Sequence, residues 1–203
     1  MTTRLELRTA LRLRLEDTGA TPLWDDATLN ESLAAAIRAY GVAVPRQVTT
    51  GVTVPAGATK VATGVALDPD RIARVADAAG IWVPPWPPWE DRPGQRTPGQ
   101  AWRWWSDELI LAEPAASSGA GLWTVEHLTG RTPPATDGEA VDVLPGDEEI
   151  VLAYAQAAAL ARRAVQDAKR GLRTDAAARA ESAREEAERL LGRRGRRARM
   201  VRG

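Results

Sequence analysis

The 203-residue sequence predicts an α+β fold, in which a helical bundle built from both ends of the chain carries a β-rich insertion. Two observations lead to this prediction. Near both ends, apolar residues recur every three or four positions, as on one face of a helix. Between them, short alternating runs rich in Val and Thr are separated by turns that contain Pro and Gly. These changes divide the chain into residues 1–43, 44–143, 144–191 and 192–203.

The N-terminal part predicts two helices. The first covers about residues 4–17 and begins with a capping box, in which Thr3 and Glu6 satisfy each other's free backbone amides. The second begins at Asp25, a residue type favoured at helix N-caps, and is expected to end at Gly41. Its predicted buried face consists of Leu29, Leu33, Ala36, Ile37 and Tyr40.

The longest regular pattern in the chain lies in residues 145–170. Asp147 is placed to cap this helix, and Gly171 is placed to end it. A mostly alanine stripe would let another helix or another subunit approach closely. The stripe consists of Ile150, Tyr154, Ala157, Ala158, Ala161, Val165 and Ala168. A fourth helix is expected from its cap Thr174 to about residue 191.

The middle of the chain predicts antiparallel strands joined by turns. They are expected at residues 47–54, 59–65, 71–76, 81–83, 108–111 and 122–128. From Pro84 onward, proline occupies most of a short stretch that also holds Trp86 and Trp89, which favours an extended, polyproline-like loop. A turn is expected at Ser106 and Asp107.

The chain has eight tryptophans and no phenylalanine, and three hypotheses for the tryptophans stay open. In the first, tryptophan fills the core as phenylalanine otherwise would; the residues concerned are Trp82, Trp102, Trp104 and Trp123. In the second, tryptophans on an exposed loop bind a partner protein; these are Trp86, Trp89 and Trp105. Stacking against a sugar is a third hypothesis.

Composition argues against several classes of function. Without cysteine, the chain cannot form disulfides, thiol nucleophiles or zinc–thiolate sites. The single histidine, His127, argues against a histidine-based metal site, and no cofactor-binding or catalytic motif is present. Glu126 beside His127 is better explained as a strand position than as a catalytic pair. No membrane span or signal peptide is expected, because no apolar run is long enough. A soluble protein made in a cytoplasm is therefore expected.

Net charge is zero, but the C-terminus is strongly basic. Six arginines follow Gly192 with no acidic residue among them: Arg193, Arg194, Arg196, Arg197, Arg199 and Arg202. One interpretation is a solvated tail without a binding role. In the other, the arginines bind nucleic-acid phosphates or an acidic groove on a protein.

The run Leu23-Trp24-Asp25-Asp26, followed by the amphipathic helix described above, resembles the head–tail connector (adaptor) proteins of tailed bacteriophages. In that family a helix start of the form W-(S/T/D)-D-x-x-L is common. The segment at residues 143–155 resembles the family's C-terminal helix. The resemblance is confined to the two ends of the chain, and the Trp- and Pro-rich insertion departs from the small, mostly helical connectors.

The resemblance implies a structural protein of the virion neck rather than an enzyme. Such proteins form a ring, commonly a dodecamer, that binds the portal protein, meets tail or neck proteins and surrounds the channel for genomic DNA. The C-terminal arginines would then contact the portal or the DNA, after synthesis of the protein in the host cytoplasm. Two other classes stay open: a nucleic-acid-binding protein that uses the arginines, and a Trp-rich carbohydrate-binding module.

Overall fold

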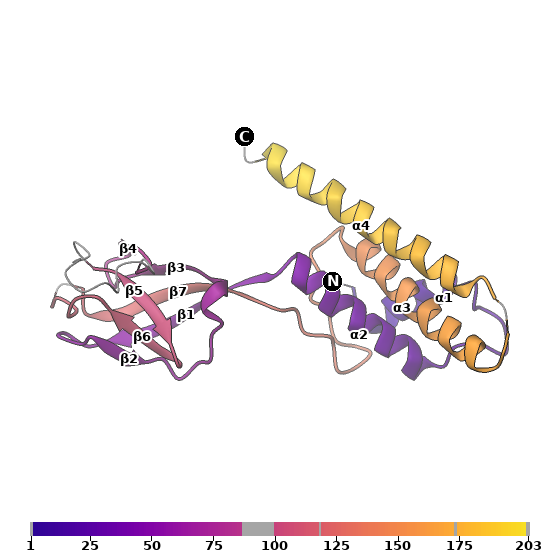
Figure 1. The fold of residues 1–203 in the computed structure, drawn as a ribbon, viewed down its shortest axis with the longest axis horizontal. Helices are drawn as coiled ribbons and strands as arrows, with labels where there is room; N and C mark the ends of the chain where they lie inside the picture. Colours follow the sequence, from indigo (N-terminus) through magenta and orange to yellow (C-terminus); the bar gives the residue numbers. More distant parts are fainter. Residues whose placement is uncertain (1, 87–99, 118, 173, 202–203) are drawn as a thin grey trace. The chain divides into compact units, whose positions relative to one another are not determined.

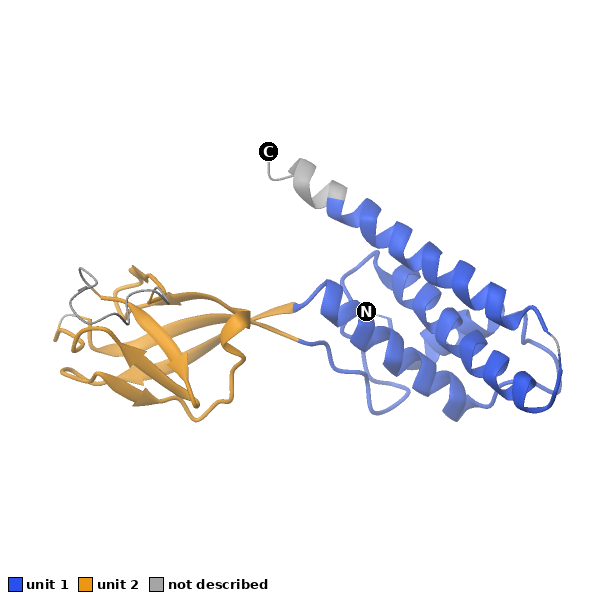
Figure 2. Cartoon of the chain, viewed as in Figure 1, with its two compact units in different colours: residues 1–45, 130–203 blue, residues 46–129 orange. Residues whose placement is uncertain are grey.

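The computed structural model describes residues 2–86, 100–117, 119–172 and 174–201, with side chains described up to residue 195 (Figure 1). The chain divides into two compact units (Figure 2). Residues 1–45 and 130–203 form the helical unit, and residues 46–129 form the β unit. Helices and antiparallel sheets are both present, so the α+β class is confirmed.

The β unit ends at residue 129, whereas the sequence placed its end at residue 143. The segment in between belongs to the helical unit, where Arg131 is buried. Its Nε donates to the backbone carbonyl of Val44 at 2.7 Å, and its Nη1 donates to Asp142 at 2.8 Å. These bonds fix the returning chain against the point where it left the helical unit.

Helix α1 spans Arg4–Arg14 and begins with the predicted capping box of Thr3 and Glu6. It ends before the predicted residue 17. Glu16 adopts a left-handed backbone conformation with φ 57°, and a right-handed α-helix cannot continue through such a residue. The carboxylate of Asp17 then accepts the backbone N–H of Leu23 at 2.5 Å, so this residue shapes the following turn.

Helix α2 spans Asp26–Ala43, and the Asp25 side chain caps it by accepting the N–H of Thr28 at 2.6 Å. The predicted buried face is confirmed. The prediction that Gly41 ends the helix is wrong, because α2 continues past it. Gly41 is needed for space: a Cβ there would lie 2.8 Å from the backbone nitrogen of Arg131.

Helix α3 spans Glu148–Lys169, and Gly171 follows with the positive φ of 70° that suits a helix end. The predicted stripe runs from the core to the surface of the helical unit: Ile150 is buried, Tyr154, Ala157 and Ala158 are half-buried, and Ala161, Val165 and Ala168 are exposed. The residues that are buried are Ile150, Val151, Leu152, Ala153, Ala155, Ala159, Leu160 and Asp167. Alanine occurs all around this helix, so the larger aliphatic side chains decide which side faces the core.

Helix α4 spans Ala176–Val201 and therefore continues beyond the predicted end at residue 191. Alanine and arginine both favour helix, which allows the arginine-rich stretch to extend it. Thr174 does not occupy the position next to the helix; its hydroxyl donates to Asp167 at 3.0 Å. The buried residues of α4 in its described part are all alanines: Ala176, Ala180, Ala183 and Ala187.

The four helices share one core, in which α3 packs against both α2 and α4 (Figure 1). Most of the largest fully buried side chains of this core come from α1 and α2, and one comes from α3: Leu7, Leu11, Leu29, Leu33, Ile37, Tyr40 and Val151. Residues from both ends of the chain thus form one packed unit.

The described part of the β unit has seven strands in two antiparallel sheets. They are β1 (Arg46–Val54), β2 (Lys60–Ala62), β3 (Ile72–Ala76), β4 (Trp82–Val83), β5 (Trp102–Trp105), β6 (Glu108–Leu111) and β7 (Gly121–Thr129). The strand orders are β1-β7-β3-β4 and β2-β6-β5. A short 3₁₀ helix, η1, spans Pro69–Arg71. Strand β5 was not predicted. The turn after it was, and Ser106 and Asp107 have φ values of 50° and 61°, as a tight hairpin turn requires.

Both sheets contribute to the core of the β unit. Trp102, Trp104 and Trp123 are buried in it, as the core-filling hypothesis predicts. The same hypothesis is wrong for Trp82, which is 55% exposed. In the two-residue strand β4, Val83 takes the inward-facing position, so its neighbour Trp82 points outward.

We expect Gly41→Ala to lower the free energy of unfolding of the helical unit by about 1–3 kcal/mol, because the added methyl group overlaps the backbone of Arg131. The matched control is Gly192→Ala in α4, where the added Cβ meets nothing within 4 Å. That control should raise the free energy by up to about 1 kcal/mol, since alanine favours helix over glycine. Urea unfolding followed by circular dichroism at 222 nm measures both. Equal effects of the two substitutions would contradict the close approach at Gly41.

Candidate functional site

The arginine-rich C-terminus is part of helix α4 rather than a separate tail. Arg193 is exposed, whereas the side chain of Arg194 points toward the start of α3, where its Nε donates to the Oδ2 atom of Asp147. Arg196, Arg197 and Arg199 lie in the last turns of α4, and their side chains, like all of Arg202, lie outside the described residues. Of the two arginines in this stretch whose side chains are described, Arg194 is thus anchored within the helical unit and Arg193 is exposed.

Asp147 is the acceptor of this contact, and sequence reasoning assigned it a different role. It stands directly before α3, but its side chain makes no capping hydrogen bond. Its Oδ2 instead accepts the hydroxyl of Tyr40 at 2.5 Å and the Nε of Arg194 at 2.5 Å. The carboxylate, which is almost fully buried, thus joins the end of α2, the start of α3 and the distal part of α4.

Tyr40 is fully buried beside this carboxylate. The guanidinium of Arg131 lies over its ring, 5.1 Å from the ring centre. Burial, the hydrogen bond to Asp147 and the charge of Asp147 raise the pKa of Tyr40 to about 12. The phenol therefore stays protonated and keeps donating to Asp147 throughout the neutral range. We call Tyr40, Arg131, Asp147 and Arg194 the anchor cluster.

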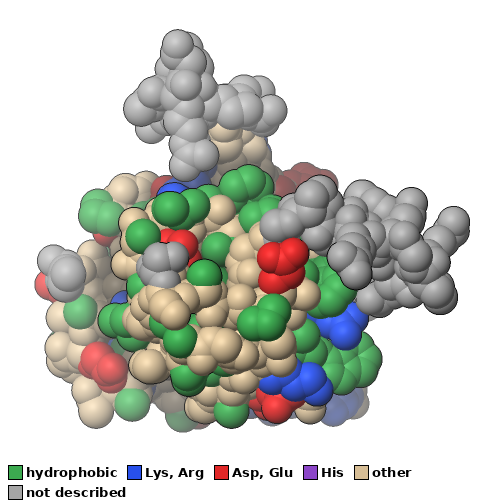
Figure 3. Space-filling view, turned by 90° about the vertical axis from the view of Figure 1, so that its left-hand side faces the viewer, with side chains coloured by type: hydrophobic (Ala, Val, Ile, Leu, Met, Phe, Trp, Pro, Cys, Tyr) green, Lys and Arg blue, Asp and Glu red, His purple; other side chains and the backbone are tan. Residues whose placement is uncertain are grey.

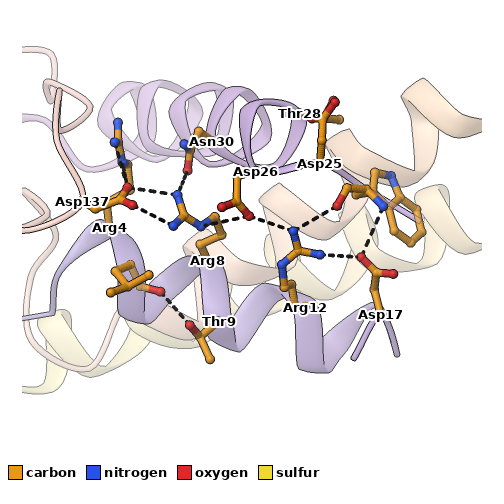
Figure 4. Close-up of polar contacts among 12 residues, drawn as sticks. Arg4, Arg8, Thr9, Arg12, Asp17, Asp25, Asp26, Thr28, Asn30 and Asp137 are labelled. Carbon is orange, nitrogen blue, oxygen red and sulfur yellow. Dashed lines mark hydrogen bonds and ion pairs between the residues drawn. The ribbon is translucent and has the colours of Figure 1, made fainter. Parts of the chain in front are cut away.

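A second set of charged residues runs along α1 (Figure 4). Arg4 and Arg8 both bind Asp137, at 2.8 Å and 2.7 Å. Arg12 binds Asp17 and Asp26, each at 2.7 Å. The guanidinium groups of Arg8 and Arg4 hold the pKa of Asp137 below its usual value, mainly through the hydrogen bond from Arg8. They are engaged within the helical unit, so they do not form a basic patch for an external ligand.

Sequence reasoning missed the row along α1. The signal was present, because Arg4, Arg8 and Arg12 recur at four-residue steps and therefore lie on one side of the helix. What the sequence could not supply was the position of their partners. Asp137 is remote in sequence, and its place beside α1 depends on the return of the chain from the β unit.

The predicted tryptophan surface is present only in part. Trp105 is 70% exposed, but it lies in strand β5 rather than on a loop. Trp86 is half-buried, and the guanidinium of Arg103 lies 4.9 Å from its ring centre. Trp89 lies outside the described residues. Trp86 and Arg103 are thus in contact, and Trp105 lies further along the same exposed side of β5.

Glu126 and His127 point to opposite faces of their sheet. His127 is buried, and its Nε2 lies 2.9 Å from the hydroxyl of Thr50, whereas Glu126 is exposed beside Arg74. The two side chains therefore do not form a pair. Within the described residues, no group of three or more potential metal ligands occurs, and no helix has the length and apolar character needed to cross a membrane.

Comparison of the sequence with models of known protein families and with curated proteins gave no match.

We expect the phenol of Tyr40 to ionise near pH 12 instead of near pH 10. The chain has two tyrosines, and burial also raises the pKa of Tyr154. The variant Tyr154→Phe therefore isolates Tyr40 in an absorbance titration of tyrosinate. Adding Asp147→Asn, which removes the carboxylate charge, should move the transition toward pH 10. A transition near pH 10 in Tyr154→Phe alone would contradict the anchor cluster.

The same shift predicts how stability depends on pH. Because the pKa of Tyr40 is higher in the folded than in the unfolded state, the folded state keeps this proton more tightly. The stabilising contribution is complete below about pH 10 and is lost as the pH rises toward 12. Comparing the unfolding free energies of the parent chain and Tyr40→Phe between pH 10 and 12 checks the direction of this change in stability. The parent should lose more stability than the variant.

Proposed function

We propose that this protein is a head–tail connector of a tailed bacteriophage, a structural protein that forms a ring between the portal and the tail. One observation is the main support for this proposal. The two segments that resemble the connector family, around Trp24 and at residues 143–155, are far apart in sequence but pack into one core. A bundle of N- and C-terminal helices, interrupted by a separately folded β insertion, is the arrangement that a connector with an added unit would have.

Exposed apolar side chains on the helical unit support assembly with neighbouring copies. On α1, Leu5 is 49% and Leu13 is 64% exposed, and on α3 Val165 is 55% exposed. Ala161 and Ala168 lie near Val165 on the same side of α3 and are also exposed. Small residues allow a neighbouring helix to approach closely, so this side of α3 suits packing between subunits of a ring.

The end of α4 supports contact with the portal. Arg194 holds the helix to Asp147, and the arginines at 196, 197 and 199 follow on the same helix. Anchoring by Arg194 would present the later arginines from a fixed point to a portal subunit. Their competing use is to neutralise phosphates of DNA in the channel, where affinity would fall steeply with salt.

The experiment for the proposal is the mass of the purified protein in solution, measured by light scattering with and without a candidate portal protein. A ring, or a monomer that assembles only on the portal, is the expected result. A monomer whose mass does not change when the portal protein is added would overturn the proposal.

We expect a chain truncated after Gly195 to lose binding to the portal while its helical unit stays folded. This truncation keeps Arg194 and thus the contact with Asp147, so loss of binding is not caused by release of α4. The matched control is the full chain with Arg184→Gln and Arg189→Gln, two exposed arginines of the same helix that lie before the anchor. The control should bind like the parent. Normal portal binding by the truncated chain would contradict docking through the last turns of α4.

Measurements of DNA affinity on the same two chains distinguish DNA binding from portal binding. If the last arginines bind phosphates, affinity for double-stranded DNA should fall linearly with salt on logarithmic axes. The truncation should then flatten that slope by about 0.9 for each phosphate that the shortened chain no longer neutralises. An unchanged slope would exclude the DNA role of these arginines.

A further inference from the structure

Strand β1 lies at one edge of the four-stranded sheet, and among the described residues β7 is its single neighbour in that sheet. The pairing is regular over all nine residues of Arg46–Val54, without a bulge. In an antiparallel sheet, every second residue of an edge strand directs its backbone N–H and C=O groups outward. Among the described residues, no backbone hydrogen bond from a segment other than β7 reaches Gln47 to Val54.

This edge lacks the features that normally keep sheet edges from pairing with other chains. Lysine, proline, bulges and short length are the usual protections. The other edge strands are shorter or covered: β2 has three residues and contains Lys60, and β4 has two residues and is followed by Pro84. The four-residue β5 bonds Pro84 and Trp86 through the backbone of Trp102. Between Gln47 and Val54, β1 has no charge, no proline and no bulge.

The core side of β1 is also incompletely covered. Its inward-facing residues alternate with exposed ones, and two of them, Val52 and Val54, are buried. The other two, Val48 and Thr50, are only half-buried although they face the same way. An added strand would cover the half-buried positions and extend the core of the sheet.

We propose that two copies of this chain pair through β1, antiparallel and about a two-fold axis at Thr50. The contact would join the two four-stranded sheets into one continuous sheet. Thr50 is the middle residue of β1, so this register is the one that pairs the complete strand with its copy. It places Val48 of one copy opposite Val52 of the other on the core side, and does so twice in each dimer.

The sequence of β1 is complementary to itself in this register. On the outer side, Gln47 lies opposite Thr53, and Thr49 lies opposite Gly51. Arg46 is the charged residue of the strand and lies opposite Val54, so no like charges meet. A two-fold contact needs such self-complementarity, because each partner presents the same surface. On the face seen in Figure 3, hydrophobic side chains lie in small groups between charged side chains, other side chains and backbone.

The pairing is independent of the proposed connector function, because it concerns the β unit and requires no portal. A connector could use it to link copies in addition to the ring contact. Its failure would leave the portal experiment unaffected, and failure of the portal experiment would leave this one unaffected.

The absence of cysteine makes a direct crosslinking test possible. Opposite residues of paired antiparallel strands have Cα atoms about 4.5–5.5 Å apart, within the range that a disulfide spans. Under mild oxidation at micromolar concentration, Thr50→Cys should form a disulfide-linked dimer. Gln47→Cys and Thr53→Cys should each stay monomeric when oxidised alone and should form a mixed dimer when oxidised together.

The single variants at 47 and 53 are the controls, because both positions are exposed but neither faces itself across the proposed axis. The mixed pair also protects the test against a local effect of Thr50→Cys, whose parent hydroxyl contacts His127. If Thr53→Cys alone formed a disulfide as fast as the mixture of Gln47→Cys and Thr53→Cys does, the crosslinks would come from random collisions. That result would overturn the proposed register. No crosslinking of Thr50→Cys and of the mixture would overturn the pairing.

Charge variants test the same contact without oxidation. Gln47→Lys combined with Thr53→Lys places like charges opposite each other at both ends of the paired strands, and should weaken dimerisation about tenfold or more. Gln47→Lys combined with Thr53→Glu changes the same exposed positions but pairs opposite charges, and should dimerise like the parent. Sedimentation equilibrium measures all three. A monomeric parent, or equal weakening by both double variants, would overturn the proposal.

Discussion

A single carboxylate, that of Asp147, connects the three longest helices of the helical unit. It accepts the hydroxyl of Tyr40 from α2 and the guanidinium of Arg194 from α4, and it directly precedes α3. A buried carboxylate is tolerated only with such donors, since loss of one partner leaves an unsatisfied group that costs about 1–3 kcal/mol. The described buried residues of α4 are alanines, which contribute little apolar area. The polar contact therefore adds a fixed point near the end of α4 to the packing of its alanines against α3.

The helical unit uses arginine in two ways. Along α1, arginines bridge acids from separate segments and orient the helix against α2 and the segment that returns from the β unit. At Arg131, one buried guanidinium bonds the carbonyl of Val44 and covers the ring of Tyr40. Arginine suits these sites because its planar group donates several hydrogen bonds in fixed directions. Part of the high arginine content of this chain thus serves contacts within the helical unit. The number of arginines therefore overstates the positive charge available to an external ligand.

Local signals in the sequence predicted local structure well. The capping box at Thr3, the cap at Asp25 and the turn at Ser106 all depend on neighbouring residues, and all are present. The errors concern remote contacts. The role of Gly41 within α2 depends on the close approach of the Arg131 backbone, and the role of Asp147 depends on Tyr40 and Arg194. The face of α3 was misassigned because alanine, present on all sides, carries little directional signal. Trp82 was misassigned because a two-residue strand gives no alternation to read.

The first and last residues of the β unit, Arg46 and Thr129, are partners in the same strand pair. Their Cα atoms are therefore separated by no more than about 5.5 Å, a gap that a very short linker can close. An insertion with such adjacent ends can enter or leave a gene without separating the helices on either side of it. The helical unit thus needs no part of the β unit to stay continuous in space, and the β unit has the geometry of a module that could be exchanged for another.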